Sequence, residues 1–233
     1  MTSYRRYKKS NNSGSQYIVY NPHVENVGSP RIINNNIIIT SIDPGVKNCG
    51  VYVNCFNLES KEHTSIMLMR LDFSKSDNKY VECIKQFDEL EKQHQYFSKS
   101  HYIVIEAQMT ISYINTRMGQ NIITYFTTKL KNRGNLPHII ELTSQAKTRL
   151  LGCPKGMKKQ EYKRWCKQKA IAFINERENK DHESVFSNKI KSATKGDDMG
   201  DTVCQLYAWM MILQNDFKDQ LCCNSSNDFI IES

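Results

Sequence analysis

The segment Ile37–Ile42 constrains the fold more than any other part of this sequence. It reads Ile-Ile-Ile-Thr-Ser-Ile, and an aspartate, Asp43, follows it directly. Runs of β-branched residues without polar alternation are typical of strands that are buried on both faces of a sheet. His101–Ala107 repeats the pattern and carries Glu106 near its end. Because helices cover such sheets on both sides, the two segments predict an α/β fold.

Strand and helix patterns alternate along the rest of the chain. Residues 49–56 and 65–71 have strand patterns, so the domain is predicted to open with an antiparallel meander. Residues 138–142 resemble a further short strand. Helical spacing or helix-ending residues indicate helices at 81–91, 112–130 and 198–214, and a basic loop and helix lie within 147–174. We therefore predict a mixed five-stranded sheet with helices on both faces.

The two ends of the chain differ in composition from the part between them. Residues 4–9 are mostly basic, residues 34–36 are three asparagines, and the first acidic residue is Glu25. We expect a flexible basic and Asn-rich arm over 1–36, one domain over 37–217 and a polar tail over 218–233. The arm also suits phosphate binding or organelle targeting, although it lacks the regular apolar stripe of an amphipathic transit helix.

Charge and cysteine content narrow the class of protein. The chain has 32 Lys and Arg against 24 Asp and Glu, and its formal charge of +8 favours an anionic partner such as nucleic acid. No apolar run approaches the roughly 18 residues that span a bilayer, so we expect a soluble protein with no membrane partner. None of the 8 cysteines forms a C-x-x-C pair. We therefore expect reduced thiols in an intracellular, reducing compartment and no structural zinc.

Four carboxylates stand at positions where an isolated acid is costly: Asp43, Glu106, Asp198 and Asp201. The first two lie at the ends of buried strands, and the other two open an apolar helix. A buried carboxylate costs several kcal/mol unless it is paired or binds a metal. Acids on these elements can converge at the end of the sheet where ligands bind in open α/β folds. Hard oxygen donors of this kind favour Mg²⁺, with Mn²⁺ as a substitute, over zinc.

Each acid also has a purely structural explanation. Asp43 precedes a Pro-Gly pair and suits a turn, while Asp197 or Asp198 suits a helix N-cap. Asp201 suits the positive end of the helix dipole. Glu106 has the weakest such explanation, because a strand interior seldom holds a Glu without a partner. The spacing does not decide which aspartate pairs with Asp201, since either Asp198 or Asp197 can share a helix face with it.

A basic loop and helix follow residue 147 and complement the acids. Two divalent ions about 4 Å apart can activate a water and stabilise the leaving oxygen of a phosphodiester. Cations nearby can then neutralise the flanking phosphates of DNA, although a solvated helix face would show the same charge pattern. We expect DNA contacts from Lys155, Lys158, Lys159, Lys163, Arg164, Lys167 and Lys169.

Three motifs surround the acids, at Ser41–Asn48, Val104–Gln108 and Lys195–Thr202. In this order and on these elements they resemble the RuvC-like Holliday-junction resolvases of the RNase H-like superfamily, especially those of poxviruses and other large DNA viruses. The resemblance implies an RNase H-like fold and a metal-dependent endodeoxyribonuclease. Such an enzyme resolves four-way DNA junctions by paired symmetric nicks, in recombination, repair or the processing of replication concatemers.

The resemblance also implies roles for individual residues. The catalytic and metal-binding acids would be Asp43, Glu106, Asp198 and Asp201. Asp197 would be an auxiliary acid, and Lys167 or Lys169 would lie near the scissile phosphate. The family further implies a homodimer without a small-molecule cofactor, in the cytoplasm or nucleus of a virus-infected cell or in a mitochondrion.

Three other functions fit parts of the same pattern. An RNase H-like hydrolase of RNA–DNA hybrids or flaps would use the same acids. A non-catalytic junction-binding protein would keep the basic face but need not retain all four acids. Asp43-Pro44-Gly45 also resembles the phosphate loop of actin-like sugar kinases, which require a second nucleotide-binding half for which 233 residues leave too little room.

Overall fold

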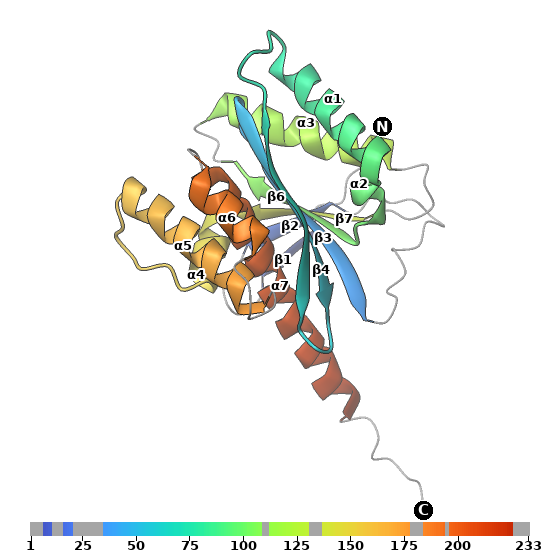
Figure 1. Cartoon of the computed structure of the whole chain (residues 1–233). Helices are drawn as coiled ribbons and strands as arrows, with labels where there is room; N and C mark the ends of the chain where they lie inside the picture. Colours follow the sequence, from blue (N-terminus) through green and yellow to red (C-terminus); the bar gives the residue numbers. More distant parts are fainter. Residues whose placement is uncertain are drawn as a thin grey trace, which may run out of the picture.

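The computed structural model describes residues 7–10, 16–20, 35–108, 112–130, 137–177, 184–193 and 196–225. In these segments a mixed sheet forms the centre, with helices packed on both of its faces (Figure 1). The described strands lie in the order β1-β2-β7-β6-β3-β4-β5. Their bounds are β1 Tyr7–Ser10, β2 Gln16–Tyr20, β3 Asn36–Asp43, β4 Asn48–Asn57, β5 His63–Asp72, β6 Tyr102–Ala107 and β7 His138–Thr143. The helices are α1 Lys79–His94, α2 Tyr96–Lys99, α3 Tyr113–Lys129, α4 Ser144–Leu150, α5 Lys159–Arg177, α6 Val185–Ser192 and α7 Gly196–Ser225.

The five strands predicted from the sequence form the main part of this sheet. β3, β4 and β5 make the expected antiparallel meander. β6 runs parallel to β3, and β7 runs parallel to β6. The predicted α/β fold, with a mixed five-stranded sheet between two layers of helices, is confirmed. β3, β5, β6 and β7 all end at the same edge, which we call the carboxyl edge.

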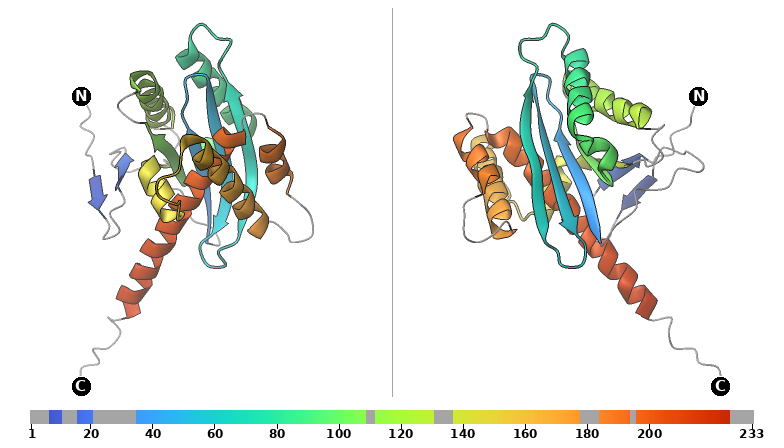
Figure 2. Two further views of the ribbon diagram at one scale, coloured as in Figure 1. Left: turned by 90° about the vertical axis from the view of Figure 1, so that its left-hand side faces the viewer. Right: turned by 45° about the vertical axis from the view of Figure 1, so that its right-hand side comes forward.

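Side chains alternate between two apolar layers, one on each side of the sheet. Figure 2 shows the helices that cover the two faces. Ile103 and Ile105 of β6 pack against α1, α2 and α3. Val104 packs in the other layer, with α4, α5, α6 and α7. Because alternate residues of a strand share a face, Glu106 is in phase with Val104 and faces the second layer. The same alternation along β3 directs Asp43 to that layer.

Both predicted terminal segments contain regular structure. Within 1–36, β2 pairs antiparallel with β7 and β1 pairs with β2, so part of the expected arm extends the sheet. The sequence Gln-Tyr-Ile-Val-Tyr of β2 has the aromatic and β-branched residues that favour strands. At the other end, α7 continues past residue 217 to Ser225. The remaining residues of 1–34 and residues 226–233 lie outside the described part, so the flexibility of the arm and the polar character of the tail stay predictions.

Two further findings concern membrane-spanning helices and the cysteine thiols. No described helix is both long enough and apolar enough to cross a membrane. The cysteines whose side chains are described carry free thiols: Cys49, Cys55, Cys83, Cys153, Cys166 and Cys204.

Candidate active site

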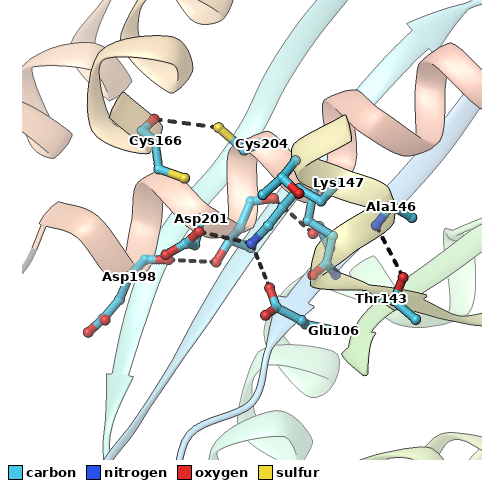
Figure 3. Close-up of polar contacts among 12 residues, drawn as sticks. Glu106, Thr143, Ala146, Lys147, Cys166, Asp198, Asp201 and Cys204 are labelled. Atoms are coloured by element: carbon cyan, nitrogen blue, oxygen red, sulfur yellow. Dashed lines mark hydrogen bonds and ion pairs between the residues drawn. The ribbon is translucent and has the colours of Figure 1, made fainter. Parts of the chain in front are cut away.

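The four predicted acids come from three elements that meet at the carboxyl edge. Asp43 is the last residue of β3, and Glu106 lies one residue before the end of β6. Asp198 and Asp201 lie near the start of α7, which crosses the second layer at this edge (Figure 3). Asp43 and Glu106 directly follow Ile42 and Ile105, which are register partners in the paired strands β3 and β6. The charges of the other three acids also raise the pKa of Asp43. The acids therefore form one cluster.

Hydrogen bonds fix the start of α7 on the sheet. Ser41 Oγ of β3 donates to the carbonyl oxygen of Thr202 at 2.9 Å. Gln205 Nε2 donates to two strand carbonyls, Ile42 O at 3.2 Å and Val104 O at 2.8 Å. These buried contacts tie the helix to β3 and β6 at once, so the acids of α7 keep their place over the strand ends.

Close packing between β4 and α7 also requires a glycine. A Cβ atom on Gly50 would lie 2.1 Å from Oγ1 of Thr202 and 2.9 Å from the carbonyl oxygen of Asp198. Contacts this short do not occur in folded proteins, so any side chain at Gly50 would push the two elements apart. The position of Asp198 therefore depends on a strand residue without a side chain.

A buried lysine, Lys147 of α4, lies between two of the acids (Figure 3). Its side chain is 2% exposed, and its Nζ donates to Oε2 of Glu106 at 2.6 Å and to Oδ1 of Asp201 at 2.9 Å. Tyr162 of α5 donates its hydroxyl to the same Asp201 oxygen at 3.2 Å. The sequence pattern gives Lys147 no role beyond its place at the start of the basic segment. The signal for its position is topological, because a helix that directly follows β7 begins at the edge where the adjacent β6 ends.

The pKa values of the buried groups follow from this packing. Burial is the main reason that the pKa of Asp43 lies well above its usual range, and the charge of Glu106 raises it further, whereas Lys147 lowers it. Burial alone would lower the pKa of Lys147, but the charges of Glu106 and Asp201 raise it well above its usual value. Lys147 is therefore a charged ammonium inside an acidic cluster.

The two aspartates at the start of α7 have different neighbours. Asn48 Nδ2 donates to Oδ2 of Asp198 at 2.5 Å, and Arg70 Nε lies 3.5 Å from the same oxygen. Asp197 instead forms an ion pair with Lys163 of α5. The structure thus directs Asp198 toward the strands and Asp197 toward α5. Sequence patterns do not identify Asn48 or Arg70 as neighbours of an acid. The packing of α7 on β4 determines the contact of Asn48, and the register between β4 and β5 determines that of Arg70.

The predicted DNA-binding residues divide into three groups. Lys163 pairs with Asp197 at the start of α7. Lys167 Nζ donates to the carbonyl oxygen of Lys191 of α6 at 3.1 Å, and it would lie 3.3 Å from a Cβ on Gly196, the first residue of α7. Lys169 lies about 200° around α5 from Lys167, on the far side of the helix. The exposed group comprises Lys155, Lys158, Lys159 and Arg164. Of the seven predicted DNA contacts, only Lys163 and Lys167 are therefore close to the acids.

The chemistry of the cluster suits a hard divalent cation. It contains four carboxylates, whose oxygens are the donors that Mg²⁺ and Mn²⁺ prefer. Among the described residues, however, no three His, Cys, Asp or Glu side chains converge closely enough to coordinate an ion. The ammonium of Lys147 takes the position between Glu106 and Asp201. The donor set fits a metal, and a protein cation neutralises part of it in this arrangement.

Solved structures of Holliday junction resolvases share this fold. Fowlpox virus resolvase, in complex with substrate Holliday junction DNA, matches with a TM-score of 0.53 and 19% identity, over 76% of this chain and 99% of its own. The yeast mitochondrial Holliday junction resolvase matches with a TM-score of 0.56 and 15% identity, over 81% and 88%. RuvC of Thermus thermophilus matches with a TM-score of 0.51 and 7% identity, over 76% and 98%. No family model and no curated protein sequence matches the chain. The predicted resemblance is thereby confirmed at the level of the fold, and the chain has the RuvC-like fold of these resolvases.

Proposed function

We propose that this protein is a metal-dependent, structure-specific endodeoxyribonuclease that resolves four-way DNA junctions. The cluster of four carboxylates at the carboxyl edge carries this proposal, because it occurs on the fold of known resolvases. Two of the similar structures, from fowlpox virus and from Thermus thermophilus, contain Holliday junction DNA. The basic surface of α5 beside the acids supports an anionic substrate of this kind.

Asp43, Glu106, Asp198 and Asp201 would hold Mg²⁺, or Mn²⁺ in its place. Divalent ions bound there supply an activated water and stabilise the leaving oxygen of the broken phosphodiester bond. The chain itself preforms the site. The ammonium of Lys147 forms ion pairs with both Glu106 and Asp201, so it keeps these two negative charges close together before substrate binds.

Cations around the acids would bind the DNA backbone. Of the predicted DNA-binding residues, Lys163 and Lys167 lie nearest to the acids, and the pairing of Lys163 with the auxiliary Asp197 holds that side chain toward α7. Exposed residues extend the surface along the loop before α5 and along the helix: Lys155, Lys158, Lys159 and Arg164. Phosphate contacts of this type provide most of the affinity of such complexes and position the duplex without reading its sequence.

Cleavage of a synthetic mobile four-way junction tests the proposal. Wild type is expected to cut the junction with Mg²⁺ or Mn²⁺, and Asp43→Asn and Glu106→Gln are expected to lose cleavage. Both variants should still bind the junction, because phosphate contacts supply the affinity. Undiminished cutting by either variant would contradict the assignment.

Substrate preference separates the alternatives. Linear duplexes, RNA–DNA hybrids and flaps of matched sequence serve as controls. Preferred cleavage of hybrids or flaps would indicate an RNase H-like hydrolase. Tight junction binding without cleavage over a panel of divalent metals would indicate a non-catalytic junction-binding protein.

We also infer that the active form is a homodimer, since two symmetric nicks require two active sites. Sedimentation of the protein with and without junction DNA measures the stoichiometry, and ligation of the products tests whether the nicks are symmetric. Such an enzyme would act in recombination or in the processing of replication concatemers, inside a virus-infected cell or a mitochondrion.

A further inference from the structure

One carboxylate oxygen of the cluster lies close to polar side chains from two strands. Oδ2 of Asp198 accepts a hydrogen bond from Asn48 of β4 at 2.5 Å and lies 3.5 Å from Nε of Arg70 of β5. The side chain of Arg70 is 27% exposed, and its guanidinium is also 3.9 Å from Asp72. A neutral donor and a cation therefore meet at the same atom of a proposed metal ligand.

The path from Arg70 to Asp198 exists because of Gly50. Gly50 of β4 is the register partner of Arg70 of β5. It is also the residue against which α7 packs so closely that a Cβ would lie 2.9 Å from the carbonyl oxygen of Asp198. Because Gly50 has no side chain, Arg70 can extend past its own strand partner to the helix. The contact is thus built into the pairing of β4 with β5.

We propose that Asn48 and Arg70 are positioning residues that set the affinity of the Asp198 carboxylate for a divalent cation in opposite directions. This inference rests on the proposed function, because it requires a divalent ion at the acids. Asn48 orients the carboxylate without adding charge, so it strengthens binding of the ion. Arg70 lies at ion-pair distance from the same oxygen, so its positive charge repels the ion and competes for that oxygen.

Arg70 and Lys147 differ in burial and in where they approach the acids. Lys147 lies between Glu106 and Asp201 and is buried, whereas Arg70 approaches Asp198 from the rim of the cluster. Removing the charge of Arg70 therefore changes the electrostatic potential at Asp198 and leaves the buried ion pairs of Lys147 in place. This makes Arg70 a suitable position for testing charge separately from folding.

Calorimetric titration of the full chain with Mn²⁺, in the absence of DNA, tests the inference. Asn48→Ala should weaken binding about tenfold or more, as expected for loss of a group that orients a metal ligand. Arg70→Gln keeps a side chain that can donate a hydrogen bond but removes the charge, and should tighten binding about tenfold. Arg70→Lys restores the charge and should return the affinity to near that of wild type.

A matched control removes one positive charge elsewhere. Lys92 is exposed on α1, on the opposite side of the sheet, and pairs with Glu89, so Lys92→Gln should leave Mn²⁺ affinity unchanged. Thermal unfolding without divalent ions checks that each variant is folded. Unchanged or weaker binding by Arg70→Gln, or unchanged binding by Asn48→Ala, overturns the inference while leaving the proposed function intact. Failure of wild type to bind Mn²⁺ overturns both.

Discussion

Replacing Lys147 by methionine should destabilise the folded protein more than any other charge-removing change at the site. Methionine has a similar length and no charge, so the variant mainly loses the ammonium. Glu106 and Asp201 would then face each other with side-chain exposures of only 16% and 18%. Neither carboxylate has enough contact with water to replace the lost ammonium. The substitution therefore lowers the stability of the native state.

The size of the effect follows from the burial of the pair. Breaking a buried ion pair by removing one partner costs about 3 to 5 kcal/mol, because it leaves an uncompensated charge. For a chain of this size, 1 kcal/mol corresponds to about 2 to 4 °C in Tm, so the Tm should fall by about 6 to 20 °C. Divalent cations should raise the Tm of Lys147→Met more than that of wild type, since the competing ammonium is absent.

Thermal denaturation with EDTA and with Mg²⁺ measures both effects. Lys159→Met removes an exposed charge from α5 and is the control, with an expected change within about 0.5 kcal/mol. Adding Glu106→Gln to Lys147→Met should recover part of the stability, because one of the two unpaired charges is then removed. A Lys147→Met variant as stable as wild type in EDTA would refute the view that this lysine neutralises the cluster.

Three further changes test other contacts of the site. Gly50→Ala should cost about 1 to 3 kcal/mol in urea unfolding, because its Cβ would overlap α7, and should reduce cleavage. Tyr162→Phe removes one hydrogen bond to Asp201 and should cost only about 1 kcal/mol in the same assay. Lys163→Ala should weaken junction binding regardless of sequence and reduce the slope of log affinity against log salt by about 1, as measured by titration at several salt concentrations. An unchanged slope would place Lys163 away from the DNA.

The strands that hold the site could be predicted from sequence because their burial determines their residues. An uninterrupted run such as Ile37–Ile42 suits only a strand covered on both faces, and an acid that ends such a run needs a partner. The alternation of side chains along β6 also determines that Glu106 shares a face with Val104. Local pattern therefore predicts the five main strands, the four acids and the face of β6 on which Glu106 lies.

Contacts that depend on strand order and register could not be predicted in this way. Lys147 reaches Glu106 only because β7 lies next to β6, and Arg70 reaches Asp198 only because its register partner is Gly50. Nothing in the residues around Lys147 or Arg70 distinguishes them from solvated cations. The addition of β1 and β2 to the sheet was missed for a related reason, since short strands at an edge depend on the neighbour with which they pair.

The position of the cations changes the interpretation of the basic charge. From sequence, the positive excess indicated a DNA-facing surface separate from an acidic centre. In the structure, Lys147 of α4 and Arg70 of β5 contact acids of the cluster directly, and Lys163 of α5 pairs with the auxiliary Asp197 beside it. Carboxylates gathered at one edge would repel each other without such partners, so the cations stabilise the cluster before any ion or phosphate binds. The same three side chains therefore link the stability of the fold to the affinity of the site for cations and DNA, and a charge change at any of them should alter more than one of these properties.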